Sequence, residues 1–269
     1  MSDCLENSFQ SVHDQLDTSI SDGVLTISIQ RPESKNALNL ELYQALAQLI
    51  DAADHSKEVR VLILKGNETD FSAGNDMKSF LQLSQLPEAG QAGNTPPFLL
   101  LKSIAKFSKP SIAAVRGVCI GVANTLLLHF DFVYADETAT FQMPFVSLGL
   151  SLEGAASILL VQRAGYHQAA DILFTAKKYN ADKALQAGII NEVVKDPYAY
   201  ANDQAHHLTS LPIASLKAVK KLMKHNLEQI LQCIDHEAEI VMQRASSPEM
   251  FEAVSAFIQK RQPDFSQFN

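Results

Sequence analysis

One carboxylate in an apolar stretch is the first group in this sequence that could do chemistry. Glu153 lies between Leu152 and Gly154, within a run of small and apolar residues at 145–160. A lone glutamate near a helix start commonly caps the helix, because the helix dipole stabilises negative charge there. In an apolar pocket the same side chain is a general base, since desolvation raises its pKa. The local sequence leaves both interpretations open.

Two small-residue turns could stabilise a developing negative charge. Residues 71–77 read FSAGNDM and residues 117–124 read GVCIGVAN, and each turn follows a strand signal and precedes a helix signal. Backbone N–H groups at a helix start are unpaired and carry positive potential, as an oxyanion hole requires. Ordinary turns and caps use the same residue types. The second turn also contains G-x-C-x-G, a nucleophile-elbow pattern with Cys119 in place of serine.

Alternating strand and helix signals in the first half of the chain must position these turns. Strands are predicted over residues 23–29, 59–64, 111–115 and 132–135, and helices after the cap Asn39 and over residues 121–129. The order strand, helix, strand implies right-handed parallel crossovers, so a parallel sheet is the expected core. Residues 85–97 contain three prolines and two glycines, which predicts a mobile surface loop, either an inert linker or a lid.

The pattern after residue 149 is mostly helical. Helices are predicted over residues 157–162, 168–174, 181–187, 198–208, 213–226, 230–244 and 249–260, with one strand at 189–194. A helical region so rich in apolar residues usually buries itself against the same chain or a symmetry mate. Oligomerisation is therefore expected.

Composition excludes several classes of protein. The chain has 269 residues, is 46% hydrophobic and carries a formal net charge of −8, which suits one catalytic domain and no nucleic-acid partner. Cys4, Cys119 and Cys233 are odd in number and far apart, which argues against disulfides or a zinc site and fits a reducing cytoplasm. The polar first ten residues and the short apolar runs predict no leader and no membrane span.

Together these segments resemble the crotonase superfamily, also called the enoyl-CoA hydratase/isomerase family. The match runs from about residue 23 to 260 and keeps the family's order. Its matching segments are Arg31 with Pro32, residues 35–38, residues 71–77, residues 115–117 with Gly121, residues 132–135, residues 173–177 and residues 187–194. The resemblance implies an α/β fold: a spiral of β-β-α turns over residues 1–200, and a helical trimerisation region over residues 201–269 that belongs to the same catalytic unit.

The resemblance also implies an acyl-CoA substrate, without a metal or a separate cofactor. Its thioester oxygen would lie between the backbone N–H groups of Asn75 and Val122. The substrate-binding positions carried over from the family are Lys35, Ala37, Ala73, Gly74, Asn75, Asp76, Met77, Gly121 and Phe145. The nearest cations for the CoA phosphates are Lys35, Lys78, Lys260 and Arg261. The implied assembly is a homotrimer, or a hexamer built as a dimer of trimers, in the cytoplasm.

Departures from the family pattern select the reaction. Hydratases of the family resemble one another in having two glutamates, and their positions are occupied here by Thr125 and Phe145, which cannot exchange a proton near neutral pH. Residues 140–154 instead resemble the Δ3,Δ2-enoyl-CoA isomerase branch, in which Glu153 matches the catalytic glutamate. The resemblance implies that this one base moves a proton from C2 to C4 of a 3-enoyl-CoA through an oxyanion-stabilised dienolate, in fatty-acid β-oxidation.

Three alternatives remain open at this stage. The first is an enoyl-CoA hydratase or another acyl-CoA lyase on the same fold, and the second is a non-catalytic acyl-CoA binding protein. The third is an α/β-hydrolase with Cys119 as nucleophile, Asp131 or Asp136 as orienter, and His167, His206 or His225 as base. A metal site is not expected, because the adjacent His206 and His207 point apart on a helix, and His225 and His236 lack nearby partners.

Overall fold

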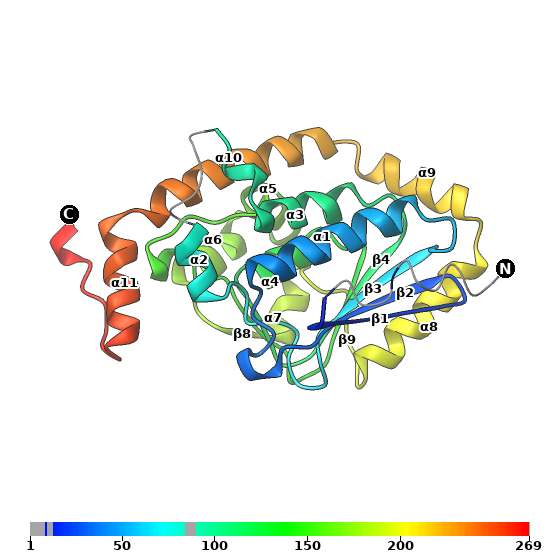
Figure 1. The fold of residues 1–269 in the computed structure, drawn as a ribbon, viewed down its shortest axis with the longest axis horizontal. Coiled ribbons are helices and arrows are strands. Elements are labelled where there is room, and N and C mark those ends of the chain that lie inside the picture. Colours follow the sequence, from blue (N-terminus) through cyan, green and yellow to red (C-terminus); the bar gives the residue numbers. More distant parts are fainter. Residues whose placement is uncertain (1–8, 10–12, 84–89, 269) are drawn as a thin grey trace.

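The computed structural model describes Phe9, residues 13–83 and residues 90–268 (Figure 1). Cys4, most of the amino-terminal segment and the first half of the predicted loop at 85–97 therefore lie outside the described residues. Within the described part of the chain, no helix is long and apolar enough to cross a membrane.

A six-stranded sheet forms the centre of the molecule. Its order is β1 (Leu16–Ser21), β2 (Val24–Ile29), β3 (Val61–Lys65), β4 (Ser111–Val115), β6 (Phe132–Ala135) and β9 (Glu192–Val193). The pair β1–β2 is antiparallel and the other pairs are parallel. The predicted parallel sheet is confirmed, and β1 is an additional strand at its edge. A second sheet joins β5 (Val118–Ile120), β7 (Thr140–Gln142) and β8 (Tyr179–Asn180); strands of two or three residues are too short to leave a periodic signal.

Helices cover both faces of the central sheet. The first half contains α1 (Leu40–His55), α2 (Met77–Leu83), α3 (Pro96–Lys106) and α4 (Val122–Leu127). The second half contains α5 (Ala156–Ala164), α6 (Tyr166–Thr175), α7 (Ala181–Gln186), α8 (Pro197–Ser210), α9 (Ile213–Met223), α10 (Leu227–Ala245) and α11 (Pro248–Ile258). All seven helices predicted after residue 149 are confirmed. Helices α1, α3 and α10 lie in one layer, α8 lies on the opposite side, and α11 stands at the end near the carboxyl terminus (Figure 1).

Strand β3 explains why this part of the sequence is continuously apolar. Val61 and Ile63 pack with residues of α8, whereas Leu62 and Leu64 belong to the core on the side of α1 and α3. Successive side chains of a strand point to opposite faces, so a parallel strand covered on both faces needs apolar residues at every position. Helix α8 thus packs on the sheet, although it runs across residue 200; the division of the chain at that residue stays a prediction.

The segment predicted to be a surface loop is partly buried. In its described part, Ala92 and Gly93 are buried, and the N–H of Ala92 donates to Glu239 of α10 at 3.1 Å. A Cβ at Gly93 would overlap the carboxylate of Asp235 on the same helix. The loop prediction is wrong for these residues, because α10 covers them and α3 already begins at Pro96.

Candidate active site

The two predicted oxyanion turns lie side by side. Ser72 and Cys119 form a parallel backbone bridge. The N–H of Ser72 donates to the carbonyl of Val118 at 2.9 Å, and the carbonyl of Ser72 accepts from the N–H of Ile120 at 3.0 Å. Asn75 and Val122 each follow this bridge by three residues. The main chain therefore brings the two turns together without help from a ligand.

Gly74 makes this close approach possible. Its φ is +85°, and a Cβ at this position would lie 2.4 Å from the carbonyl oxygen of Ile120 and 3.8 Å from the Cα of Gly121. Gly121 also has a positive φ, +59°, immediately before α4 begins. Only glycine fits where a left-handed backbone also meets another backbone at such short range.

The N–H groups of Asn75 and Val122 remain available. The N–H of Leu38 donates to the carbonyl of Gly74 at 2.7 Å, and the carbonyl of Leu38 accepts from the N–H of Asp76 at 2.9 Å. In such a parallel bridge the N–H of Asn75 faces away from Leu38. Val122 is the first residue of α4, so its N–H has no intrahelical acceptor. In the described part of the chain neither N–H donates to an acceptor, and the pair is suited to bind an oxyanion.

The segment before α1 holds the first turn in place. Asn36 is fully buried, and its carbonyl accepts from the hydroxyl of Ser72 at 2.7 Å. The N–H of Ala73 donates to the carbonyl of Lys35 at 2.9 Å. Lys35 and Asn36 both adopt a positive φ, 51° and 57°. The structure thus places the predicted positions Lys35 and Ala73 against one another, with the Lys35 side chain exposed.

Arg31 joins two further predicted positions. Its Nη1 donates to the carbonyl of Ala37 at 2.9 Å and to the carboxylate of Asp76 at 2.8 Å. The other carboxylate oxygen of Asp76 accepts two N–H groups from the first turn of α2, at 3.0 and 3.2 Å. Met77 begins this helix and is half-buried. Sequence analysis had assigned no role to Arg31 beyond its place in a family motif, yet Arg31 ties the two segments together.

Glu153 is a buried carboxylate with one hydroxyl partner. Its residue is 5% exposed, and Oε1 accepts from the hydroxyl of Thr125 at 2.5 Å. Burial raises the pKa of Glu153 to about 8; the Thr125 hydrogen bond partly opposes this rise and the charge of Glu237 adds to it. Thr125 lies three residues after Val122 on α4, and residues with this spacing share one helix face. The hydroxyl partner of Glu153 and the second oxyanion turn are therefore carried by the same turn of α4.

The helix-capping interpretation of Glu153 is wrong. The carboxylate that binds the start of α5 belongs to Glu237 of α10, which accepts from the N–H of Ala155 at 2.6 Å and from the N–H and hydroxyl of Ser157 at 3.1 and 2.5 Å. Sequence analysis missed Glu237. A signal was present, because Glu237 falls at helical spacing from the apolar Ile230 and Ile234 and so lies on the buried face of its helix.

His129 supports the backbone next to Glu153. Its Nε2 lies 2.8 Å from the carbonyl oxygen of Gly154, so this nitrogen carries the hydrogen and donates. Burial, with the nearby charge of Lys224, lowers the pKa of His129 to about 3, and the ring is neutral. Gly154 itself has a φ of +78°, and a Cβ there would lie 3.1 Å from the Cβ of Thr125. The Glu153 backbone is thus packed directly against α4.

The remaining predicted substrate residues are spread more widely. Phe145 is buried at the start of a short 3-10 helix (Val146–Leu148). Lys78 and Lys260 are exposed surface charges. Arg261 is engaged by Glu252 through two hydrogen bonds of 2.5 and 2.8 Å. A role of these cations in binding CoA phosphates stays a prediction.

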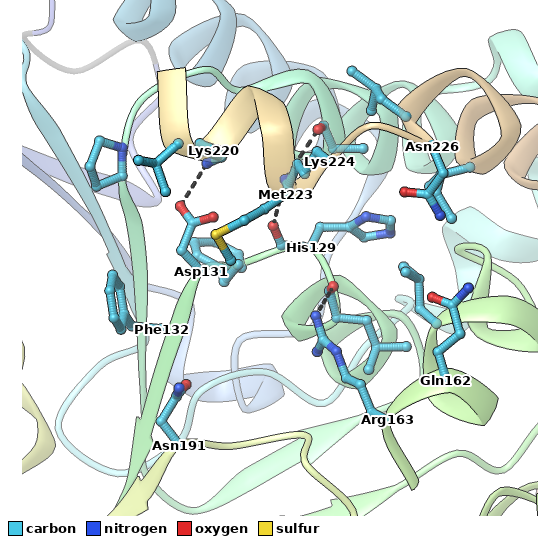
Figure 2. A pocket seen from close by; sticks show the side chains of 18 of the residues that line it. His129, Asp131, Phe132, Gln162, Arg163, Asn191, Lys220, Met223, Lys224 and Asn226 are labelled. Atoms are coloured by element: carbon cyan, nitrogen blue, oxygen red, sulfur yellow. Dashed lines mark hydrogen bonds and ion pairs between the residues drawn. The ribbon is translucent and has the colours of Figure 1, made fainter. Parts of the chain in front are cut away.

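A pocket of about 560 Å³ lies elsewhere, between the sheet and α9. Figure 2 shows its polar groups: Lys220 binds Asp131 at 2.6 Å, and Lys224 donates to the carbonyl of His129 at 3.1 Å. Arg163 donates to the carbonyl of Leu128 at 2.6 Å. These cations bind carbonyl groups at the carboxyl-terminal ends of helices or form an ion pair. Neither Glu153 nor the oxyanion turns line the pocket. Its wall meets the candidate site only through His129.

The cysteine-hydrolase alternative is not supported. Cys119 is fully buried within β5, and burial raises the pKa of its thiol well above the usual range. Its three proposed bases, His167, His206 and His225, are all exposed. A nucleophile needs a base within hydrogen-bond reach and access to substrate.

Among the described residues there is also no group of three or more histidine, cysteine or acidic side chains that could hold a metal.

Comparison with known proteins identifies the class of enzyme. Residues 19–268 match the family model described as enoyl-CoA hydratase/isomerase. A solved structure from Acinetobacter baumannii, described as an enoyl-CoA hydratase/isomerase, is 62% identical, superposes with a TM-score of 0.88, and covers 92% of this chain and 100% of its own. The chain belongs to the enoyl-CoA hydratase/isomerase family and has the crotonase fold.

Relatives in this family have more than one activity. The 2,3-dehydroadipyl-CoA hydratase of Escherichia coli is 30% identical over 245 residues, which are 90% of this chain and 94% of that protein. Human enoyl-CoA delta isomerase 2 is also 30% identical over 245 residues, which are 89% of this chain and 62% of that longer protein. Family membership therefore defines an enoyl-CoA enzyme, and the choice between hydration and isomerisation depends on the residues at the site.

Two substitutions should move the pKa of Glu153 in opposite directions. Thr125→Val removes the hydrogen bond that stabilises the ionised carboxylate, so the pKa should rise above its value of about 8. Glu237→Gln removes a neighbouring negative charge, so the pKa should fall. Carbon-13 NMR titration of the glutamate carboxyl groups, assigned with Glu153→Gln, measures both shifts. Equal pKa values in all three proteins would contradict the described environment of Glu153.

Replacing Gly74 should separate the two oxyanion turns. In Gly74→Ala the new Cβ would meet the carbonyl of Ile120, and overpacking of this kind costs about 1–3 kcal/mol in addition to the backbone strain. Gly90→Ala is a matched control, since Gly90 has nearly the same φ, +83°, but no described residue has an atom within 4 Å of a new Cβ. Denaturant unfolding should show a larger loss for Gly74→Ala. Equal losses of unfolding free energy in the two variants would mean that backbone strain, and not the contact with Ile120, destabilises Gly74→Ala.

Proposed function

We propose that this enzyme is a Δ3,Δ2-enoyl-CoA isomerase that acts in fatty-acid β-oxidation. The observation that carries the proposal is the pairing of one buried, high-pKa carboxylate, Glu153, with the hydroxyl of Thr125. Glu237 is also buried, but its two oxygens accept N–H and O–H groups at the start of α5. Glu153 is then the carboxylate left to exchange a proton with a substrate.

The proposed reaction needs one base and one oxyanion hole. Ionised Glu153 removes a proton from C2 of a 3-enoyl-CoA, and the electron pair moves into the thioester carbonyl to form a dienolate. The N–H groups of Asn75 and Val122 stabilise the oxygen that gains negative charge. Protonated Glu153 then delivers the proton to C4, the C2–C3 double bond forms and the carbonyl is restored. The chemistry consumes no cofactor and no metal.

Hydration is the alternative within the family, and several relatives are hydratases by name. Water addition needs a group that deprotonates the water and a group that protonates C2. The two positions that carry glutamates in the hydratase pattern hold Thr125 and Phe145 here. In the structure Thr125 is used as a hydrogen-bond donor to Glu153. These observations favour isomerisation over hydration.

We also propose a homotrimer, alone or paired into a hexamer, in the cytoplasm. Support comes from large apolar side chains that are exposed on α9 and α11, namely Val219, Leu222, Met223, Phe251, Phe257 and Ile258. Several exposed apolar side chains on one helix usually mark an interaction site, and α9 and α11, at opposite ends of the molecule, each carry three (Figure 1). Sedimentation velocity should give a mass of three or six chains of 29.5 kDa each. A monomeric mass would contradict the proposal.

Loss of the base should abolish the reaction without abolishing binding. Glu153→Gln keeps the shape of the side chain but cannot take a proton, so turnover of 3-octenoyl-CoA to 2-octenoyl-CoA should fall by a factor of about 10³ or more, while octanoyl-CoA still binds. The wild-type kcat/KM should increase with pH and level off above about pH 8, because Glu153 must be ionised. A coupled assay and isothermal titration calorimetry provide the two measurements.

The same assay separates the alternatives. Wild-type protein incubated with crotonyl-CoA should form 3-hydroxybutyryl-CoA far more slowly than it isomerises 3-octenoyl-CoA. Comparable rates would make the protein a hydratase, and binding without either reaction would make it an acyl-CoA binding protein. Retained isomerisation in Glu153→Gln would exclude Glu153 as the base.

A further inference from the structure

A buried tyrosine contacts the side chain of an oxyanion-turn residue. Tyr43 lies in the first turns of α1, is 1% exposed, and its hydroxyl donates to Oδ1 of Asn75 at 2.5 Å. The pairing of Leu38 with Asn75 places the start of α1 beside this turn. Asn39 fixes that start by accepting from the N–H of Leu42 at 2.8 Å. Tyr43 is therefore held in register with Asn75 by the main chain.

The orientation of the Asn75 amide follows from this contact. Burial, together with the charges of Glu153 and Asp76, raises the pKa of Tyr43 well above its usual range, so the phenol keeps its hydrogen. A buried hydroxyl hydrogen without an acceptor is costly, and the amide oxygen of Asn75 is the acceptor that Tyr43 uses. With Oδ1 on Tyr43, the amide cannot rotate by 180° without losing this bond. Its NH2 group must point the other way.

The NH2 group of Asn75 has no partner in the described part of the chain. Nδ2 donates to no acceptor among the described residues, and it is not one of the buried polar atoms that lack a partner. It is therefore at least partly exposed to solvent. The group stands on the residue whose backbone N–H is free at the first oxyanion turn. A fixed and unsatisfied donor at this place is available to a substrate.

We infer that Tyr43 and Asn75 act as a pair, in which Tyr43 fixes the amide of Asn75 so that Nδ2 donates a hydrogen bond to the reacting end of the bound acyl thioester. Asn75 then contributes its side chain in addition to its backbone N–H, and Tyr43 is a positioning residue that acts through Asn75. The identity of the ligand rests on the proposed function. The contact between Tyr43 and Asn75 is independent of that function.

A double-mutant cycle tests the pair. Tyr43→Phe removes only the hydroxyl, and Asn75→Ala removes the amide while keeping the backbone N–H. Each variant should lower kcat for 3-octenoyl-CoA by about tenfold, the size of one lost hydrogen bond in the transition state. In the Asn75→Ala background, Tyr43→Phe should have no further effect on kcat, because Tyr43 acts only through Asn75.

Tyr198→Phe is the matched control. Tyr198 is a buried tyrosine of α8, on the face of the central sheet opposite to α1, and its hydroxyl donates to the carbonyl of Asn67. Its substitution should lower the free energy of unfolding to a similar extent as Tyr43→Phe, but kcat should be unchanged. A structural role of Tyr43 would change stability alone, so an unaltered kcat in Tyr43→Phe would overturn the inference. Additive effects in the cycle would overturn it too.

Calorimetric binding of octanoyl-CoA distinguishes failure of the inference from failure of the proposed function. If the wild-type protein binds octanoyl-CoA but does not isomerise 3-octenoyl-CoA, the proposed function fails. Weaker binding in Tyr43→Phe and Asn75→Ala, with no further loss in the double variant, would then still support the pair. Unchanged binding in all three variants of such a protein would overturn the inference.

Discussion

The candidate site depends on the opposing interactions that set the pKa of one buried carboxylate, Glu153. Burial penalises the charge of Glu153, the hydroxyl of Thr125 stabilises it, and the charge of Glu237 opposes it again, which together bring the pKa to about 8. A base with a pKa near the working pH is both ionised often enough and basic enough to be effective. In the proposed reaction, every element that touches Glu153 therefore affects the base as well as the fold.

The contacts of Glu237 show that the carboxyl-terminal helices take part in the site. Glu237 comes from α10, yet it holds the start of α5 directly after Glu153 and Gly154. Its two oxygens satisfy N–H groups that α5 would otherwise leave unpaired. A change in the position of α10 would move the backbone on which Glu153 stands. The helical region and the core are consequently joined by the contacts of Glu237.

Family membership and reaction are decided by different kinds of contact. The oxyanion turns depend on main-chain pairing and on Gly74, features that suit any acyl-CoA chemistry on this fold. In the proposed function, the choice of reaction depends on side chains on α4 and in the segment before α5, where Thr125 faces Glu153. This division is consistent with the presence of hydratases and isomerases among relatives of about the same identity.

Sequence alone determined the parallel core, the helical second half and the two turns, because periodicity and small residues are local signals. It left Glu153 divided between a helix cap and a base. Tertiary structure excluded the cap, since the capping carboxylate, Glu237, lies 84 residues further along the chain and meets α5 only in the folded state. The contact of Tyr43 with Asn75 also joins residues that are far apart, 32 positions along the chain. Long-range contacts of buried polar groups leave no periodic trace, and so only the fold reveals them.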